Sequence, residues 1–305
     1  MPRVPDVSVV IPARDAAGTL PRTLEALAVQ TLARERVEVI VVDDGSTDAT
    51  RTLAKASDVV DRVVAIGGLG PGAARNAGAA AARGAVLAFT DADCFPEPAW
   101  LERGLAALED DDLVQGVVHP ERDPGPFGRT VWVTAPGGLF ETANLLVRRD
   151  VFAALGGFPP GLRPGGGKEM GEDVLFGWAA RRSGVRIGFV QDAVVRHAVF
   201  ERGPLGFVAE RRRLSAFPAL AAAVPELRSA LLWRRGFLSS RSAAFDAAVL
   251  GVIARRPVAA LPYVGFVARD LRRLGPVPAA VRVAADGVGA AALVVGSVRH
   301  RSLLL

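Results

Sequence analysis

Short apolar runs alternate with helical patterns through roughly the first third of the chain. Five apolar runs predict strands, at residues 7–11, 37–43, 62–66, 85–89 and 113–118. Most of them are apolar throughout rather than at alternate positions, which is typical of parallel strands buried on both faces. The segments between them predict helices, at residues 19–30, 47–56, 71–83 and 98–109. This alternation predicts an α/β fold with a mostly parallel, doubly wound, Rossmann-like sheet.

The pattern becomes less regular after the fifth predicted strand. Two stretches rich in proline and glycine, 124–128 and 159–167, predict loops. A strand is expected at 143–148, a helix at 172–183 and a final strand at 185–190. The same domain is therefore expected to continue past the alternating region.

The chain from about residue 205 onward is rich in Ala, Leu and Arg. Its apolar stretches, 243–254, 257–268 and 283–298, are each shorter than the roughly 20 residues that a helix needs to span a bilayer. We therefore favour helices that lie in a membrane interface or re-enter it over a clean span. The alternative is an ordinary helical subdomain that packs on the rest of the protein.

Composition narrows the class of protein. Half of the residues are apolar, which excludes wholesale disorder, and the single cysteine excludes an internal disulfide framework. The opening residues lack the features of a secretory signal, so a cytoplasmic location is expected. The net charge of +5 is unevenly distributed: residues 1–200 hold 21 basic and 26 acidic residues, and residues 201–305 hold 16 and 6. A basic, apolar tail favours contact with an anionic membrane or with nucleic acid.

Acidic side chains follow two of the predicted strands. Asp43 and Asp44 end the second strand, where paired carboxylates can accept hydrogen bonds from a nucleobase or ribose, although this segment could equally cap the next helix. Asp91 and Asp93 follow the fourth strand, and carboxylates at this spacing can together bind Mg²⁺ or Mn²⁺. The alternative for this second pair is a strand end with solvated acids.

Further candidates lie at a helix start and near the end of the predicted domain. Glu172 and Asp173 open a helix after the glycine-rich loop, so either helix capping or a general base is possible there. His197 is either a structural residue or a metal ligand that acts with Asp93. Arg75, in the segment GPGAARNAG, can pair with phosphate. That segment lacks a Walker A lysine and the GxGxxG spacing, which disfavours a nucleoside triphosphatase or an NAD-dependent dehydrogenase.

The order of these motifs resembles a family 2 glycosyltransferase with the A-type nucleotide-diphospho-sugar transferase fold. The matching segments, within about residues 7–200, are VSVVIPARDAAGTLPRTLEALAVQ, VEVIVVDDGSTDAT, GPGAARNAGAAAARG, VLAFTDADCFPEPAWL, TANLLVRRDVFAALGGF and GEDVLFGWAARRSG. The resemblance implies a catalytic domain at 1–204, with a nucleotide-binding half at 1–118 and an acceptor half at 119–204. A helical tail at 205–305 follows it.

The resemblance also implies roles for individual residues. It implies that Asp173 is the catalytic base and that Glu172 lies near the acceptor. It implies that the donor is bound by a set of residues near the strand ends, namely Pro12, Ala13, Asp43, Asp44, Arg75, Asp91 and Ala92. The implied ligands of Mn²⁺ or Mg²⁺ are Asp93, Asp91 and His197. A single base and no covalent sugar–enzyme intermediate predict inversion at the anomeric carbon.

The implied substrates are a nucleotide-diphospho-sugar, with a UDP-sugar favoured, and a glycan or a polyprenyl- or lipid-linked acceptor. The chain is expected to act in cell-envelope glycan or glycolipid synthesis, peripherally at the inner face of the cell membrane. A nucleotidyltransferase and a binding protein without transfer activity are the alternatives. Nucleic acid is disfavoured as a partner, because few aromatic residues are interleaved with Arg211–Arg213 and Arg234–Arg235.

Overall fold

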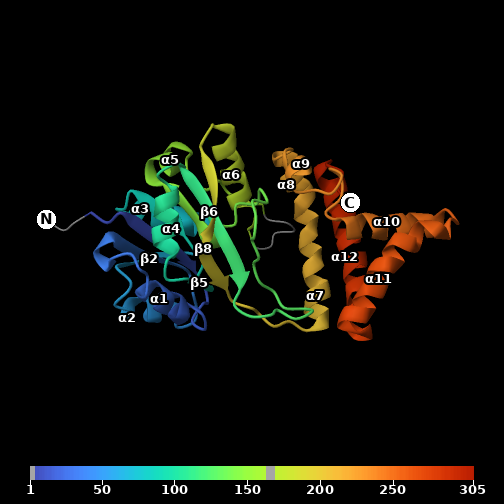
Figure 1. Cartoon of the computed structure of the whole chain (residues 1–305), viewed down its shortest axis with the longest axis horizontal. Coiled ribbons are helices and arrows are strands. Elements are labelled where there is room, and N and C mark those ends of the chain that lie inside the picture. The colour runs from blue at the N-terminus through green and yellow to red at the C-terminus, as the bar shows by residue number, and fades with distance from the viewer. Residues whose placement is uncertain (1–3, 163–168) are drawn as a thin grey trace. The chain divides into compact units, whose positions relative to one another are not determined.

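The computed structural model describes residues 4–162 and 169–305 (Figure 1). The described residues within Met1–Asp123, Thr130–Gly161 and Lys168–Val199 form one compact unit, here unit 1. Those within Pro124–Arg129, Leu162–Gly167 and Phe200–Leu305 form a second, here unit 2. Most of the predicted loop 159–167 lies outside the described residues. The domain boundaries given above remain predictions.

Unit 1 is built on one eight-stranded sheet within the described residues. Its strands are, in chain order, β1 (Val7–Ala13), β2 (Val37–Asp44), β3 (Arg62–Ile66), β4 (Val86–Phe89), β5 (Cys94–Pro96), β6 (Leu113–Pro120), β7 (Leu145–Arg148) and β8 (Ile187–His197). Their order across the sheet is β3-β2-β1-β4-β7-β6-β8-β5. The strands β3, β2, β1 and β4 are parallel neighbours, and β6 and β8 are also parallel.

The sheet is mixed, because β7 pairs antiparallel with both β4 and β6, and β5 pairs antiparallel with β8. The predicted α/β class with helices on both faces is confirmed. The antiparallel strand β7 lies after the fifth predicted strand, in the region where the sequence pattern loses its regularity.

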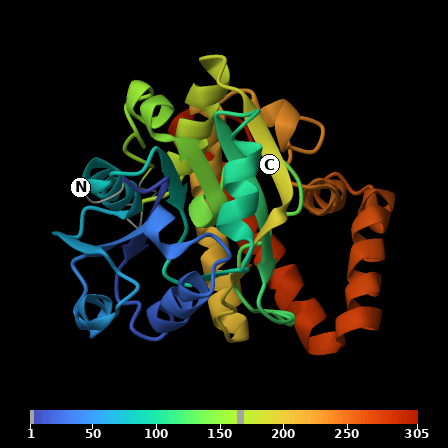
Figure 2. The same cartoon turned by 60° about the vertical axis from the view of Figure 1, so that its left-hand side comes forward.

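Helices cover both faces of the sheet (Figures 1 and 2). They are α1 (Leu20–Ala28), α2 (Thr50–Ala56), α3 (Pro71–Ala81), α4 (Trp100–Ala107), α5 (Arg149–Ala154) and α6 (Glu172–Arg182), with short 3-10 turns η1 (Arg34–Arg36) and η2 (Thr142–Asn144). On one face, side chains such as Val9 and Val39 share a core with α1, α2 and α4. On the other face α3 lies so close that a Cβ at Gly78 would come within 2.4 Å of Val10. An aromatic cluster that joins Phe89 to α5 and α6 continues this second face.

Two features at the β5 edge differ from the sequence prediction. The strand predicted at 185–190 runs on to His197, because its pairing with β6 resumes after a register shift at Gly116 and Val117. The strand β5 was not predicted, since three residues are too few to show a hydrophobic period. Its pairing sets Cys94 opposite His197.

Unit 2 is helical (Figure 2). Its helices are α7 (Pro204–Glu210), η4 (Arg211–Ala216), α8 (Phe217–Ala223), α9 (Leu227–Ala230), α10 (Ser240–Ile253), η5 (Pro257–Ala260), α11 (Leu261–Leu274) and α12 (Pro276–His300). With 25 residues, α12 is longer than the apolar stretch seen in the sequence, and it is long and apolar enough to cross a membrane. Arg282 and Asp286 do not interrupt it, because both form ion pairs within unit 2. Only 28% of its most apolar window is buried in the protein.

Candidate active site

The carboxyl ends of β2, β1 and β4 meet at one edge of the sheet. The strand β1 has the parallel neighbours β2 and β4, so the strand order reverses here, which is where open α/β sheets generally bind ligands. Pro12 and Ala13 end β1, opposite Val42 and Asp43 of β2. Asp91 comes directly after β4. The structure therefore brings the predicted donor-binding residues to a common edge.

The two acids that end β2 are both buried and are held by different partners. Asp43 accepts hydrogen bonds from Ser46 N (3.2 Å) and from Arg51 Nε (2.7 Å). The Asp44 carboxylate accepts from the backbone N–H groups of Leu69 (2.7 Å) and Gly70 (2.9 Å). Gly70, at φ 105°, precedes α3. Asp44 thus fixes the loop that leads into the helix carrying Arg75.

Arg75 is the central residue of the cluster. Its side chain is 5% exposed, and it donates from Nη2 to Asp91 Oδ1 (2.6 Å) and from Nη1 to Glu172 Oε1 (2.9 Å). One arginine therefore joins the end of β4 to the start of α6. Glu172 Oε2 is buried and has no hydrogen-bond partner among the described residues. The sequence placed Arg75 beside donor phosphate, whereas the structure places it between two carboxylates.

Asp173 lies next to this bridge, in the first turn of α6. Gly171 before the helix has φ 85°, a conformation that glycine adopts without strain and that sets the direction in which α6 starts. Burial raises the pKa of Asp173 to about 8, and the negative charge of Glu172 raises it further than burial alone would. A carboxylate whose conjugate acid has a pKa of about 8 is a much stronger base than a solvated aspartate.

His197 and Asp93 lie together because β5 pairs with the end of β8. His197 Nε2 is 3.6 Å from Asp93 Oδ1, too far for a hydrogen bond. His197 Nδ1 is 2.7 Å from the carbonyl oxygen of Ala198. Because a carbonyl oxygen can only accept, Nδ1 is the donor in this contact, and Nε2 is the ring nitrogen nearer Asp93.

This pair fits a divalent metal ion. Two ligand atoms bound to one ion at distances of about 2.1 Å lie roughly 3.0–3.4 Å apart, near the observed separation. The Nδ1–carbonyl hydrogen bond is the outer contact that orients a ligating histidine. The atoms of Asp93, His197 and Cys94 lie within 4.8 Å of one another, but burial raises the pKa of the Cys94 thiol, which disfavours a thiolate ligand. Asp91 is outside this group, and its predicted contact with the metal remains a prediction.

Glu141 is a neighbour that the sequence analysis missed. Burial raises its pKa, and its carboxyl accepts a hydrogen bond from Gln115 Nε2 (2.8 Å). Its charge also contributes to the raised pKa of Asp173. Its place directly before the matched segment TANLLVRRD was a usable signal, but a single glutamate in a loop has no distinctive spacing.

The comparisons with known proteins agree with this geometry. Residues 8–162, half of the chain, match the model of glycosyl transferase family 2. Glycosyltransferase AglE of Haloferax volcanii is 33% identical over 218 residues, which cover 66% of this chain and 70% of AglE. The validoxylamine A glucosyltransferase of Streptomyces hygroscopicus subsp. jinggangensis is 42% identical over 108 residues, which cover 34% of this chain and only 26% of that enzyme.

The fold also matches solved structures of glycosyltransferases. A mannosyltransferase of Pyrobaculum calidifontis, solved with GDP-Man and Mn²⁺, has a TM-score of 0.60 at 20% identity and covers 97% of this chain and 87% of its own. TarS of S. aureus, solved with UDP-GlcNAc, has a TM-score of 0.57 at 21% identity and covers 97% and 92%.

The fold, with acidic residues at the carboxyl edge of its sheet, thus defines a sugar-nucleotide transferase of the A type, as predicted. The chain belongs to glycosyl transferase family 2. The predicted class of enzyme, a glycosyltransferase, is confirmed. The roles of the individual site residues remain predictions.

Proposed function

We propose that this protein is an inverting, metal-dependent glycosyltransferase that moves a sugar from a nucleotide diphosphate to an acceptor hydroxyl. The observation that carries the proposal is the chain of contacts Glu172–Arg75–Asp91, with Asp173 beside it. It joins the strand end expected to bind the donor to the helix start expected to bind the acceptor. The structurally similar enzymes solved with GDP-Man and with UDP-GlcNAc support the same donor class.

On the donor side, the chain supplies a hydrogen-bonding edge for the nucleoside and ligands for a cation. Pro12, Ala13, Asp43 and Asp44 border the nucleoside in this proposal, and Asp91 and Ala92 lie toward the ribose and sugar. Asp93 and His197 hold Mn²⁺ or Mg²⁺. When bound, such an ion neutralises the negative charge that develops on the departing diphosphate.

On the acceptor side, Asp173 takes the proton of the attacking hydroxyl. A buried carboxylate near the anomeric carbon can do this without forming a bond to the sugar, which predicts inversion. Glu172 is held by Arg75 through one oxygen, and the other oxygen, Oε2, has no partner among the described residues and therefore requires a hydrogen-bond donor. An acceptor hydroxyl meets this requirement.

The acceptor is proposed to be linked to a membrane lipid at the inner face of the cell membrane. Exposed apolar side chains gather on the segment from the end of α10 through η5 to the start of α11, here the α10–α11 tip. They are Leu250 (63% exposed), Val252, Ile253 (73%), Val258 and Leu261. Arg255 and Arg256 lie among them and are also exposed. Apolar residues flanked by arginines are typical of a segment that enters the interface of an anionic membrane.

The transfer activity is tested by a screen of UDP-, GDP- and dTDP-sugars with Mn²⁺ and with Mg²⁺, scored by release of the nucleoside diphosphate. We expect release with one donor, dependent on the metal and lost in the presence of EDTA. An NMR spectrum of the product then shows whether the anomeric configuration is inverted. Full activity in EDTA would remove the metal from the proposal, and retention of configuration would remove the single-base mechanism.

The membrane part is tested separately by co-sedimentation of the full chain with vesicles of phosphatidylcholine and phosphatidylglycerol. The double variant Leu250→Glu/Ile253→Glu should bind vesicles less tightly, because moving two charged glutamates from water into the membrane interface costs free energy. Val29→Glu, at an exposed valine of unit 1, is the matched control and should bind as the parent does. Equal binding by all three proteins would exclude the α10–α11 tip as the contact.

A further inference from the structure

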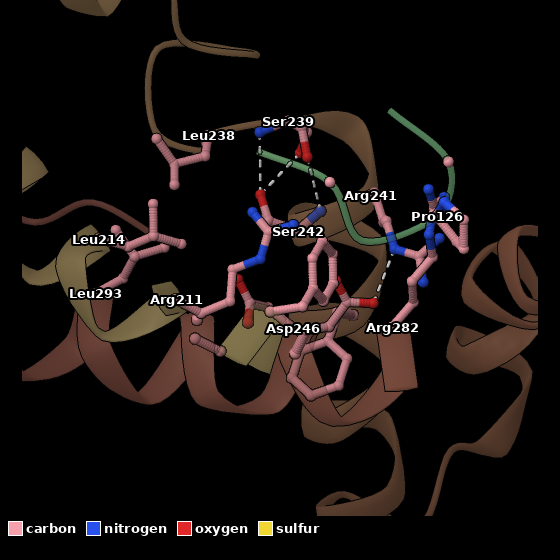
Figure 3. Close-up of a pocket in the computed structure, with 18 residues that line it drawn as sticks. Pro126, Arg211, Leu214, Leu238, Ser239, Arg241, Ser242, Asp246, Arg282 and Leu293 are labelled. Atoms are coloured by element: carbon pink, nitrogen blue, oxygen red, sulfur yellow. Dashed lines mark hydrogen bonds and ion pairs between the residues drawn. The ribbon is translucent and has the colours of Figure 1, made fainter. Parts of the chain in front are cut away.

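Unit 2 contains a cavity of about 520 Å³ that has no part in the proposed transfer reaction (Figure 3). This volume lies in the range of pockets that hold small-molecule ligands, about 300–1,000 Å³. All of its lining residues belong to unit 2. They come from the loop around Pro126, from α7 and η4, from the start of α10 and from one face of α12.

The cavity has a polar side that carries more arginine than acid. Arg211, Arg241 and Arg282 line it, together with two aspartates, Asp246 and Asp286. Arg241 donates to Asp286 Oδ2 (2.8 Å) from Nε, and to Asp270, a residue outside the lining, from Nη1. Its remaining nitrogen, Nη2, is buried and has no hydrogen-bond partner in the described part of the chain. The Nε of Arg282 is also buried and also has no hydrogen-bond partner among the described residues.

Arg211 is the cation that the surrounding carboxylates do not neutralise. Its guanidinium lies over the ring of Phe207, 4.7 Å from the centroid, and it forms no hydrogen bond or ion pair with any residue that the structure describes. Burial lowers the pKa of Arg211, and the charge of Asp286 offsets this effect only in part. Burial also raises the pKa of Asp246, whose Oδ2 has no hydrogen-bond partner among the described residues.

The rest of the cavity lining includes an apolar part. Phe207, Leu214, Leu238, Phe245 and Leu293 contribute to it. Figure 3 shows Arg211 between the leucines Leu214 and Leu293 on one side and Asp246 on the other. A ligand that satisfies both sides has an anionic head with several acceptor oxygens and an apolar chain.

From this arrangement we infer that the cavity of unit 2 binds a phosphoryl group, with Arg211 as the principal contact. Guanidinium groups form paired, charge-assisted hydrogen bonds with phosphate oxygens, and the guanidinium of Arg211 has no hydrogen-bond partner among the described residues that would compete for them. The phosphoryl group can come from a lipid phosphomonoester, whose chain would lie along the apolar side, or from free phosphate. The inference does not depend on sugar transfer.

The test uses the full chain in EDTA and measures the thermal shift caused by inorganic phosphate at constant ionic strength. Phosphate should raise the melting temperature of the parent, since a ligand that binds only the folded state stabilises it. Arg211→Gln should weaken the apparent affinity by about tenfold or more, because one charge-assisted contact is lost. Arg212→Gln removes the same charge from the exposed neighbouring residue and should respond as the parent does.

Two further variants keep the result interpretable. Arg211→Lys retains the charge and should keep part of the response even if Arg211→Gln folds poorly. Asp93→Asn alters the candidate metal site of unit 1 and should leave the response unchanged. A parent that phosphate does not stabilise, an unchanged response in both Arg211 variants, or a response abolished by Asp93→Asn would each overturn the inference.

Vesicles distinguish the two sources of the phosphoryl group. The chain is sedimented with phosphatidylcholine vesicles that contain either phosphatidic acid, a phosphomonoester, or phosphatidylglycerol at equal surface charge. A preference for phosphatidic acid that Arg211→Gln abolishes and Arg212→Gln retains identifies a lipid source. Equal binding to both vesicles, together with the Arg211-dependent thermal shift, identifies free phosphate.

Discussion

Units 1 and 2 both place arginines among carboxylates, but among the described residues they leave different groups without an ion pair, Asp173 in unit 1 and Arg211 in unit 2. In unit 1 a single buried arginine, Arg75, lies among Asp91, Glu172 and Asp173, so acids are in surplus. In unit 2 three arginines share a cavity with two aspartates, and Asp270, outside the lining, forms ion pairs with Arg241 and Arg282, so Arg211 is the arginine left without one among the described residues. The first arrangement suits a cation and a proton acceptor, and the second suits an anion. The same residue types therefore produce opposite chemistry according to which type is left unpaired.

The largest expected effect tests the surplus of acid in unit 1. Asp173→Asn should lower the transfer rate by about 10²–10⁴-fold, the usual contribution of a general base, while donor binding stays close to that of the parent. The rate is measured by release of nucleoside diphosphate and the binding by calorimetry. Asp150→Asn is the matched control, because Asp150 also lies in a first helical turn and accepts from the next N–H, as Asp173 does, yet is exposed. Near-normal transfer by Asp173→Asn would remove Asp173 as the base.

The next effect compares the two buried arginines directly. Arg75→Met leaves the buried Glu172 and the partly exposed Asp91 without their partner, so the free energy of unfolding should fall by about 3–5 kcal/mol. Arg241→Met should cost less, because its side chain is 18% exposed and Arg75 is 5% exposed. Chemical denaturation measures both. Arg22→Met, at an arginine with a 54% exposed side chain, is the surface control and should cost under about 1 kcal/mol. Equal losses in all three variants would contradict this account.

A smaller effect concerns the cation that unit 1 is expected to hold. His197→Gln should weaken activation by Mn²⁺ by roughly 10–100-fold, since it removes an imidazole that faces Asp93. The measurement is a titration of activity with Mn²⁺ after EDTA treatment. His119→Gln, at a histidine of β6 outside the metal-binding group, is the control. If both variants are activated as the parent is, His197 is not a ligand.

The smallest effect is a shift of the pH profile. Asp173 acts as a base only when ionised, so kcat/KM should rise with pH and level off above about 8. Glu172→Gln removes a nearby negative charge that raises the pKa of Asp173, so the rising limb should move to lower pH, by less than about one unit. If the rising limb of the pH profile of Glu172→Gln stays in place or moves to higher pH, another group controls the rate.

The sequence and the structure agree best where the fold depends on local pattern. The strand β3 has the predicted bounds, and β1 and β2 extend beyond theirs by one or two residues. The helix predicted at 172–183 is observed as α6, Glu172–Arg182. Continuous apolar runs and helical spacing act over a few residues, so they can be read before the chain is folded.

The agreement is weaker where contacts join distant residues. The edge strand β5 and the extension of β8 depend on each other, since each supplies the hydrogen-bond partner of the other. The face of α12 that lines the cavity of unit 2 is likewise not visible as a motif, because its partners lie on α10, α11 and η4.

By itself, the amino-acid sequence determined the α/β class, the family and the list of acidic residues, because these follow from local periodicity and from short motifs in order. Only the tertiary structure decided that Arg75 binds two carboxylates, Asp91 and Glu172, that are 81 positions apart in the sequence. It likewise decided that His197 faces Asp93. It also decided which charges remain unpaired. The reason is physical: pairing, burial and the resulting pKa depend on neighbours that folding brings together, and no local segment contains them.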